Sequence, residues 1–305
     1  HRRTFELIIT QSFLLNKWNF RSTIKSSERI EETAMPTPRV AAIHDLSCFG
    51  RCSLTIALPV LSAMGCQCCP LPTALLSAHT GFTGGSFLDL TEEMQRIADH
   101  WARIDIHFDG IYSGFLGSAA QIGTVQQFIT RFRGTGLVVI DPVLGDHGQA
   151  YRTCTPELCN GMRRLAESAD IITPNLTEAS LLLEQSYETI QAIDPAETVR
   201  RLSLEGRRSV VLTGYSTGDG QTGALCFDRA DGSIQAVQVQ RVPRDFSGTG
   251  DLFTSVLTGA MVKGVPLIQA ARTAADFVQS CAARTLAAGN TDGEGVDFEP
   301  LLGML

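Results

Sequence analysis

The stretch Arg244–Ala260 reads RDFSGTGDLFTSVLTGA and places a glycine-rich turn and an acid before an apolar run. Gly248 and Gly250 flank Thr249, so the backbone can turn tightly and leave amide N–H groups unpaired where a helix begins. Such amides, at the positive end of a helix dipole, bind phosphate and other anions. Asp251 in the first turn can accept a proton from a hydroxyl that attacks phosphorus. The stretch therefore predicts a phosphoryl-transfer site.

An ordinary helix start could use the same residues. Asp251 would then only complement the helix dipole, and the glycines would only turn the chain. A motif this short is weak evidence by itself, so the rest of the chain must decide. The sequence has no match to G-x-x-x-x-G-K-[ST], which argues against a P-loop kinase.

The composition is that of an acidic globular protein. The chain has 305 residues, of which 44% are hydrophobic, and its net charge is −7. It has no Lys/Arg-rich run to neutralise a phosphate backbone, which argues against nucleic acid as a partner. No apolar run approaches the roughly 18 residues that span a bilayer, and no secretory signal pattern opens the sequence. We therefore expect a cytoplasmic protein that does not bind membranes.

The cysteines and the first residues need separate interpretations. Nine cysteines, an odd number in a long chain, are expected to be reduced thiols, and the run CQCCP at 66–70 fits a buried strand better than a zinc site. Residues 1–34 carry six Lys/Arg and four Asp/Glu and lack Gly and Pro. We expect them to be a non-native or disordered extension, with a basic transit segment as the alternative, and expect residues 35–305 to form one domain.

From residue 39 onward, short β-branched runs alternate with helical patterns. This order is typical of an α/β fold in which helices cover both faces of a mostly parallel sheet, giving three layers. The expected strands are 39–44, 66–71, 108–114, 137–143, 170–175 and 209–214, followed by an antiparallel pair at 222–228 and 233–239. The expected helices are 53–64, 91–104, 118–131, 155–168, 177–184, 195–205, 250–262 and 266–288.

Ligands of open α/β sheets bind at the carboxyl ends of the strands, so the residues there are site candidates. Asn175 and Glu178 in PNLTEA offer an amide oxygen and a carboxylate, which suit magnesium bound through water. The same pair could instead cap the next helix. Asp141 ends its own strand, and Thr213 with Gly214 ends another and could meet nucleotide phosphates or simply leave the sheet.

The segment DPVLGDHG, residues 141–148, continues from a strand through two glycines. It could close over a nucleotide and exclude water, or it could be a polar surface loop. Its His147, like His44 and His79, lies on the site side of the predicted sheet. A single histidine at a strand end is more often structural, so we assign none of them as a base.

The motifs SGTGD, PNLTEA and DPVLGD, in their order along the chain, resemble those of the ribokinase-like superfamily of small-molecule kinases. AIHDLSCFGRCSL, LSAHTGF and YSGFLGSAAQ narrow the resemblance to the pyridoxal/pyridoxamine kinases, which phosphorylate vitamin B6. The likeness runs from about residue 39 to about residue 288. It implies a ribokinase-like α/β/α fold, ATP and Mg²⁺ as cofactors, and a homodimer as a common assembly, although the sequence reveals no interface.

The resemblance also implies roles for individual residues. Asp251 would deprotonate the 5′-hydroxyl, and the amides from Gly248 through Thr249 and Gly250 to Asp251 would form the anion hole. Asn175 and Glu178 would organise Mg-ATP with Asp141 nearby, and Thr213 with Gly214 would contact the nucleotide. Thr80 in HTG would bind the vitamer. The residues expected to bind substrate are thus Asp45, Thr80, Phe115 and Asp251.

Two of these positions depart from the family pattern. Asp45 stands where familiar pyridoxal kinases carry the serine of QSH, and Phe115 stands where related chains carry a tyrosine. A carboxylate favours a protonated ring nitrogen or an amine, because a charge-assisted hydrogen bond is the stronger contact. We therefore expect pyridoxamine or pyridoxine to be preferred over pyridoxal.

Two other functions remain open on the sequence alone. One is a ribokinase-like kinase of hydroxymethylpyrimidine, of a sugar or of another small alcohol, although related hydroxymethylpyrimidine kinases carry cysteine where this chain has Asp251. The other is a sensor that binds the vitamer without transferring phosphate. A sensor has no need of a base, so Asp251 argues against it.

Overall fold

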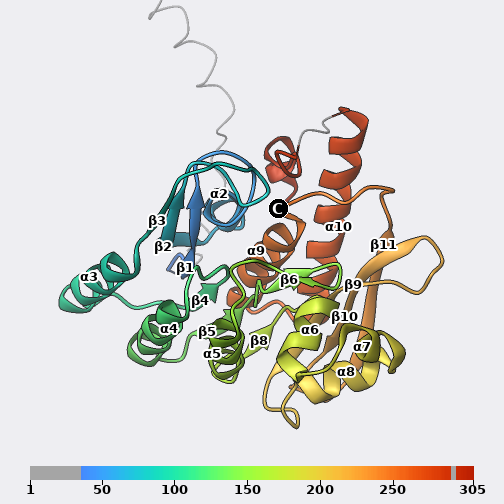
Figure 1. The fold of residues 1–305 in the computed structure, drawn as a ribbon, viewed down its shortest axis with the longest axis horizontal. Coiled ribbons are helices and arrows are strands. Elements are labelled where there is room, and N and C mark those ends of the chain that lie inside the picture. The colour runs from blue at the N-terminus through green and yellow to red at the C-terminus, as the bar shows by residue number, and fades with distance from the viewer. Residues whose placement is uncertain (1–35, 290–292) are drawn as a thin grey trace, which may run out of the picture. The chain divides into compact units, whose positions relative to one another are not determined.

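The computed structural model describes residues 36–289 and 293–305, so the predictions for residues 1–34 lie outside the described part. Contacts divide the chain into His1–Pro36 and Thr37–Leu305. The second unit is built on one sheet of nine strands in the order β11-β10-β9-β8-β5-β4-β1-β2-β3 (Figure 1). The strands are β1 Arg39–Ser47, β2 Gln67–Leu76, β3 Phe87–Asp89, β4 Gly110–Ser113, β5 Leu137–Ile140, β8 Ile171–Ile172, β9 Ser209–Tyr215, β10 Gln221–Phe227 and β11 Ile234–Gln240.

The central strands run parallel, from β2 through β1, β4, β5 and β8 to β9. The antiparallel strands lie at the two edges, with β3 at one and β10 and β11 at the other. This arrangement confirms the predicted mostly parallel sheet and its antiparallel pair. The carboxyl ends of the parallel strands consequently meet at one edge of the sheet, where the candidate residues follow.

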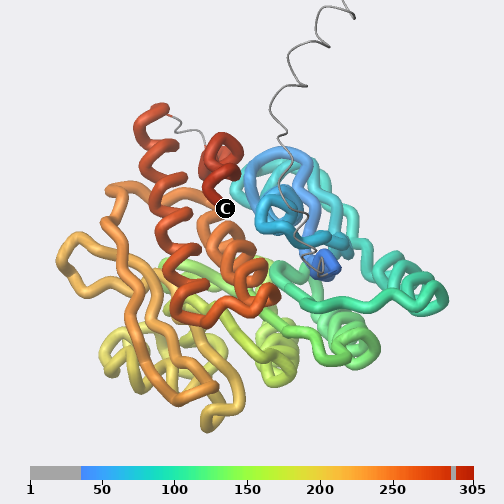
Figure 2. The backbone as a smooth tube through the Cα atoms, turned by 180° about the vertical axis from the view of Figure 1, so that it is seen from behind, coloured from blue at the N-terminus to red at the C-terminus, as the bar shows by residue number. Residues whose placement is uncertain are grey.

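Helices cover both faces and give three layers. One face carries α2 Leu54–Ala63, α9 Thr249–Val262, α10 Leu267–Ala287 and the 3₁₀ helix η1 Glu299–Met304. Figure 2 shows α9 and α10, in orange and red, in front of the sheet on this side. The other face carries α3 Thr91–Arg103, α4 Ala119–Phe132, α5 Pro156–Ala166, α6 Leu176–Leu183, α7 Tyr187–Ala192 and α8 Pro195–Leu202.

The strand β1 shows why the central strands read as continuous apolar runs. Ala41 and Ile43 pack into the core on one face, and Val40 and Ala42 pack into the core on the other. All four are fully buried. A strand buried on both sides has no solvent face, so apolar and polar residues do not alternate.

The structure also contains short elements that the sequence pattern did not predict. These are β3, the helix α7, the 3₁₀ helix η1, and a hairpin of β6 Gly145–Asp146 and β7 Gln149–Ala150, which begins within the segment 141–148 and extends past it. Each is too short to show a periodic pattern. The strand β2 also extends beyond the predicted 66–71 despite Pro70 and Pro72, because β3 pairs only with Ala74–Leu76 and leaves the prolines on an open edge.

The prediction of reduced cysteines is wrong for one pair. Cys154 and Cys159 form a disulfide across the beginning of α5, with their Cα atoms 6.1 Å apart. The helix starts between them, with Thr155 as its N-cap, and the first turn brings the two side chains together. The other seven cysteines are free thiols. None of the helices in the described residues combines the length and apolar character needed to cross a membrane.

Candidate functional site

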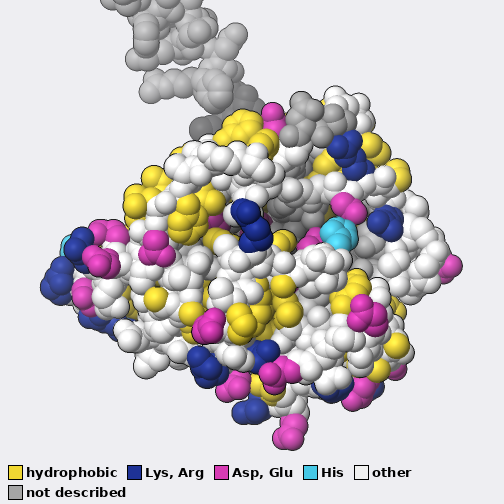
Figure 3. Space-filling model, in the orientation of Figure 1, with side chains coloured by type: hydrophobic (Ala, Val, Ile, Leu, Met, Phe, Trp, Pro, Cys, Tyr) yellow, Lys and Arg dark blue, Asp and Glu magenta, His cyan; other side chains and the backbone are white. Residues whose placement is uncertain are grey.

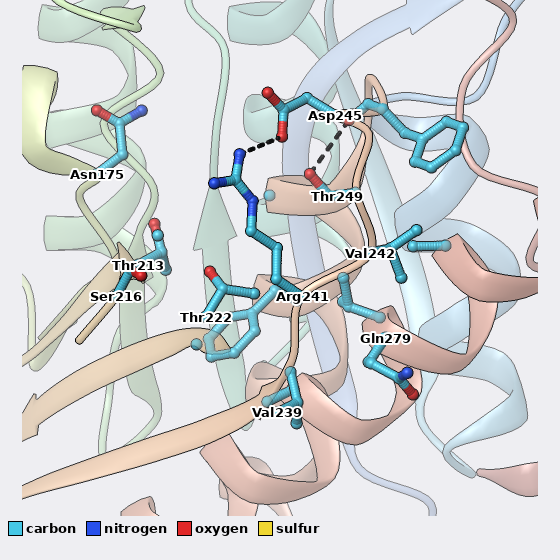
Figure 4. A pocket seen from close by; sticks show the side chains of 18 of the residues that line it. Asn175, Thr213, Ser216, Thr222, Val239, Arg241, Val242, Asp245, Thr249 and Gln279 are labelled. Atoms are coloured by element: carbon cyan, nitrogen blue, oxygen red, sulfur yellow. Dashed lines mark hydrogen bonds and ion pairs between the residues drawn. The ribbon is translucent and has the colours of Figure 1, made fainter. Parts of the chain in front are cut away.

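A cavity of about 430 Å³ opens beside the carboxyl ends of the central strands and the beginning of α9. Figure 3 shows this face of the molecule, which is hollowed near its centre, with hydrophobic side chains gathered over β2 and β3. Five predicted site residues line the cavity: Asn175, Thr213, Gly214, Thr249 and Gly250. In Figure 4, Asn175 and Thr213 lie on one side, and Thr249 lies across from them at the beginning of α9.

Thr249 and Gly250 of the glycine-rich turn line this cavity. The helix begins at Thr249, one residue before the predicted start, and its N-cap Gly248 has φ 82°. The first intrahelical bond runs from the Leu252 N–H to the Gly248 carbonyl, at 2.9 Å. The three amides before it precede the first closed turn, so they are available to an anion. The turn therefore has the backbone geometry that an anion site needs, and its role as an anion site stays a prediction.

Gly248 is also required by a close approach of the chain. A Cβ at this position would lie 2.2 Å from the carbonyl oxygen of Arg51. Gly295 approaches the same oxygen, where a Cβ would lie at 2.8 Å. Arg51 in turn donates its N–H to the Glu294 carbonyl at 2.7 Å, and the Val296 N–H reaches the Ser247 carbonyl at 3.3 Å. Three distant segments therefore join at this point, which we call the Arg51 junction.

Asp251 follows Gly250 and lies beside the cavity rather than among the residues that line it. Its Oδ2 accepts the backbone N–H of Ser53 at 2.9 Å. Burial raises the pKa of Asp251 to about 6, the Ser53 hydrogen bond opposes this rise, and the charge of Asp45 adds to it. At neutral pH the Asp251 carboxylate is therefore mostly ionised. Its pKa lies about one unit below neutral pH, which is the range that suits a general base.

Asp45, near the end of β1, shares a hydrogen-bond donor with Asp251, because Ser53 donates to both carboxylates. Its Oδ1 accepts the hydroxyl of Ser53 at 2.5 Å, and its Oδ2 accepts the hydroxyl of Ser47 at 2.8 Å. Asp45 is only 4% exposed, and burial raises its pKa while the two hydroxyls and nearby His79 lower it. The structure thus brings together the predicted base and the predicted ring-binding acid.

The other two predicted substrate residues are not joined to this pair by hydrogen bonds within the described part of the chain. Thr80 is exposed, beside His79, whose Nδ1 accepts the Gly81 N–H and whose Nε2 therefore donates to the Gly293 carbonyl at 2.8 Å. Phe115 is buried, and its carbonyl accepts the hydroxyl of Thr73 at 3.2 Å. Their roles toward a substrate remain predictions.

Asn175 and Glu178 form the helix cap that was the alternative interpretation of PNLTEA. The Asn175 side chain accepts the Glu178 N–H, and the Glu178 carboxylate accepts the Asn175 N–H, both at 2.9 Å. The second Glu178 oxygen accepts the Leu144 N–H at 3.1 Å. Each Glu178 oxygen accepts one backbone N–H and keeps a second lone pair, which can accept a hydrogen bond from a metal-bound water.

Glu178 and nearby Asp141 are buried, which disfavours the negative charge of both carboxylates. Burial raises the pKa of Glu178 to about 7 and raises that of Asp141 well above its usual range. The charges of Glu178 and Asp251 raise the pKa of Asp141 further. Among the described residues no three His, Cys, Asp or Glu side chains form a group that could hold a metal ion, so these carboxylates fit Mg²⁺ only as residues that organise its waters.

His44 and His79 make structural contacts, whereas His147 is exposed and lines the cavity. His44 is fully buried, packs edge-on against the Tyr112 ring at 4.2 Å, and its pKa is lowered by burial to about 3. Its ring fills the space beside Gly114, where a Cβ would lie 2.3 Å from Nδ1. His147, at the tip of the β6–β7 hairpin, lies 3.9 Å from Asp245 on the opposite rim of the cavity.

Sequence reasoning missed three charged residues that line the cavity, Arg241, Arg244 and Asp245. Arg241 and Asp245 both line the cavity and form an ion pair at 3.5 Å. Figure 4 shows the Arg241 side chain reaching along the cavity toward Asp245. A basic residue shortly before the glycine-rich turn, in RVPRDF, was the available signal. This basic residue alone did not indicate a site, because exposed arginines are common in proteins.

Three comparisons with known proteins agree with this arrangement. The family model described as phosphomethylpyrimidine kinase matches residues 57–295. The pyridoxine/pyridoxal/pyridoxamine kinase of Bordetella avium (strain 197N) is 30% identical over 259 residues, which cover 81% of this chain and 86% of that protein.

Solved structures extend the likeness. The pyridoxal kinase of Lactobacillus plantarum has 33% identity and a TM-score of 0.82, covering 88% of this chain and 96% of that one. A Bacteroides thetaiotaomicron protein, provisionally named a phosphomethylpyrimidine kinase and crystallised with pyridoxal, has 41% identity and a TM-score of 0.81, covering 87% and 94%. Because the matched residues include most of the sheet, the glycine-rich turn and Asp251, this chain belongs to the phosphomethylpyrimidine kinase family, with the ribokinase-like fold that its motifs predict.

Proposed function

We propose that the protein transfers the γ-phosphoryl group of ATP to the 5′-hydroxymethyl group of a vitamin B6 vitamer. The observation that carries this proposal is that Asp251 lies in the first turn of α9, directly after Thr249 and Gly250, which line the cavity. Several relatives and solved neighbours named for pyridoxal, pyridoxine or pyridoxamine support the choice of acceptor. The same family includes kinases of phosphomethylpyrimidine, which keeps that alcohol as the alternative.

In this mechanism the protein orients the reactants and stabilises charge. Asp251 accepts the proton of the attacking hydroxyl, and the amides of Thr249, Gly250 and Asp251 face the charge that develops on the transferred phosphoryl group. Asp45 holds the cationic part of the vitamer by a charge-assisted hydrogen bond. Thr213 and Gly214 contact the nucleotide on the other wall.

Mg²⁺ would be organised by Asn175 and Glu178 through water, with Asp141 close to it, and would supply positive charge to the phosphates when bound. The repulsion among the buried acids supports this assignment. The carboxylates themselves would orient the waters, since the backbone N–H groups of Asn175 and Leu144 already fix the Glu178 oxygens.

ADP release, measured with ATP and Mg²⁺ against pyridoxamine, pyridoxine, pyridoxal, hydroxymethylpyrimidine and ribose, tests the proposed function. We expect the highest kcat/KM with pyridoxamine or pyridoxine. Preference for hydroxymethylpyrimidine or ribose would replace the proposed acceptor. Binding of a vitamer without ADP release would instead show a sensor.

The rate is expected to fall on the acid side of neutrality. The raised pKa of Asp251, about 6, means that the base form dominates above this pH and is lost below it. We expect kcat/KM to decline about tenfold for each pH unit below about 6. A pH series with saturating ATP measures this limb. A profile that stays flat down to about pH 4.5, well below the pKa, would contradict the role of Asp251.

Asp45→Asn is expected to raise KM for pyridoxamine and pyridoxine by about ten- to a hundredfold, because the amide lacks the charge that strengthens the hydrogen bond. KM for ATP should change little, since Asp45 is not among the residues that line the cavity. Steady-state kinetics for both substrates check this. Asp99→Asn, on exposed α3, is the control, and equal KM values in the two variants would refute the contact.

A further inference from the structure

Ser53 has a backbone conformation that serine rarely adopts. It lies just before α2 with φ 50° and ψ −127°, a region that favours glycine, and its side chain is almost fully buried. Conformations of this kind cost free energy and persist where the surrounding structure holds them in place. The position therefore calls for an explanation beyond a simple connection between β1 and α2.

Helix capping does not provide that explanation. Serine at an N-cap usually accepts a backbone N–H from the first helical turn through its side chain. The Ser53 side chain makes no such bond with α2. The nearby Thr55 hydroxyl oxygen accepts the Cys52 N–H at 3.2 Å, so a different residue stabilises the turn. The Ser53 hydroxyl is directed away from the helix.

The two polar groups of Ser53 contact different carboxylates. Its backbone N–H donates to Asp251 Oδ2 at 2.9 Å, and its hydroxyl donates to Asp45 Oδ1 at 2.5 Å. The unusual φ and ψ angles are what allow one residue to reach both. Asp251 comes from α9, 198 residues away in sequence, and Asp45 comes from β1.

We infer that Ser53 is a positioning residue that holds Asp251 and Asp45 in one fixed arrangement. The proton-accepting carboxylate of Asp251 and the substrate-binding carboxylate of Asp45 then keep a constant distance from each other. The inference rests on the proposed function for the reaction it serves. Fixing Oδ2 of Asp251 leaves Oδ1 to receive the proton. Fixing Asp45 sets the distance from the bound ring to that base, and a small error in such a distance costs much of the rate.

The charges that surround the pair come from several elements. His79 lowers the pKa of Asp45 from its loop, while Asp141 at the end of β5 and Tyr112 on β4 lie on the sheet side of Asp251. Burial raises the pKa of the Cys52 thiol, beside Ser53, and the charges of Asp251 and Asp45 raise it further. A change in pH profile can therefore be assigned to Ser53 only by comparison with a matched variant.

The matched variants are Ser53→Ala, Ser53→Gly and Ser47→Ala. Ser53→Ala removes the hydroxyl, and Ser53→Gly also relieves the backbone strain and loosens the turn. Ser47→Ala removes the other hydroxyl on Asp45 without touching Asp251. Ser53→Ala keeps the backbone N–H that Asp251 accepts, but without the hydroxyl nothing on its side chain holds the strained φ of residue 53, so we expect this N–H to shift. We therefore expect Ser53→Ala to lower kcat/KM for the vitamer by about ten- to a hundredfold, with part of the loss in kcat. Ser47 has no such backbone strain, so Ser47→Ala should raise KM alone.

Comparing Tm with kcat in the Ser53 variants distinguishes a positioning role of Ser53 from a purely structural one. We expect Ser53→Gly to lose at least as much kcat as Ser53→Ala while its Tm equals or exceeds that of Ser53→Ala, because glycine tolerates the backbone angles. The Ser53→Ala loss should also shrink in an Asp45→Asn background, as coupled residues show in a double-mutant cycle. Activity that follows Tm, or equal losses in both backgrounds, would overturn the inference.

A binding measurement keeps this test separate from the proposed function. Titration calorimetry of pyridoxamine should show about tenfold weaker binding to Ser53→Ala than to the wild type, because the hydroxyl no longer fixes Asp45. If the wild type binds pyridoxamine but transfers no phosphate, the proposed function fails while the Ser53 contact to Asp45 is still measured. Unchanged affinity in Ser53→Ala would overturn the inference whatever the reaction proves to be.

Discussion

Asp251→Asn is expected to lower kcat by about 10²- to 10⁴-fold, the usual contribution of a positioned general base. Asparagine keeps the size of the side chain and an oxygen that can accept the Ser53 N–H, so the turn should fold as before. KM for ATP should therefore stay within about twofold. Steady-state kinetics with the preferred vitamer measure both values, and near-normal kcat would refute the role of the base.

The matched control for this prediction is Asp245→Asn, a second carboxylate near the same turn. Asp245 lines the cavity and pairs with Arg241, so its loss should act on nucleotide binding. We expect a higher KM for ATP and a smaller loss of kcat than in Asp251→Asn. Equal losses of kcat in the two variants would mean that any negative charge near the turn suffices.

Gly248→Ala is expected to lower kcat by about 10²- to 10³-fold, as when a donor to a developing anion is lost. The new Cβ would lie 2.2 Å from the Arg51 carbonyl, and φ 82° is already unfavourable for alanine. The turn must shift to relieve this contact, and the amides of Thr249 and Gly250 shift with it. Kinetics together with a thermal melt measure the effect.

Gly264→Ala separates the backbone strain from the loss of geometry. Gly264 follows α9 at its opposite end and has φ 81°, and a Cβ there would meet no atom of the described residues within 4 Å. Both variants should lose a similar amount of stability from the unfavourable φ. Only Gly248→Ala should lose most of its kcat. If Gly264→Ala loses as much activity, strain rather than the anion site explains the result.

The fold could be predicted from the sequence because its central strands and long helices carry strong local patterns. The strand β1 and the helix α9 were identified within a few residues of their ends. The strand β3 and the β6–β7 hairpin were not predicted, because two or three residues cannot show periodicity and their pairing depends on distant chain. The prolines of β2 argue against a strand in the sequence alone. They fit one in the structure because, within the described residues, no strand pairs with Pro70 and Pro72 on the side where they lack an N–H.

The candidate site divides in a similar way. The turn at Gly248 and the acid at Asp251 were predictable, since glycine and a following helix determine that geometry locally. The link from Ser53 to Asp251 was not, because it joins residues far apart in sequence through a backbone N–H that nearly every residue carries. PNLTEA predicted both a metal-organising pair and a helix cap, and the structure realises the cap without excluding water-mediated organisation of a metal.

The Arg51 junction determines when the site can assemble during folding. The segments around Arg51, Gly248 and Gly295 are distant in sequence, and their ordering entropy must be lost before their contacts form. Local helices can form much earlier, but the turn acquires its shape only when the last of these segments arrives. Recovery of catalysis on refolding should accordingly trail recovery of helical circular dichroism, so helical content alone would overstate the fraction of competent molecules.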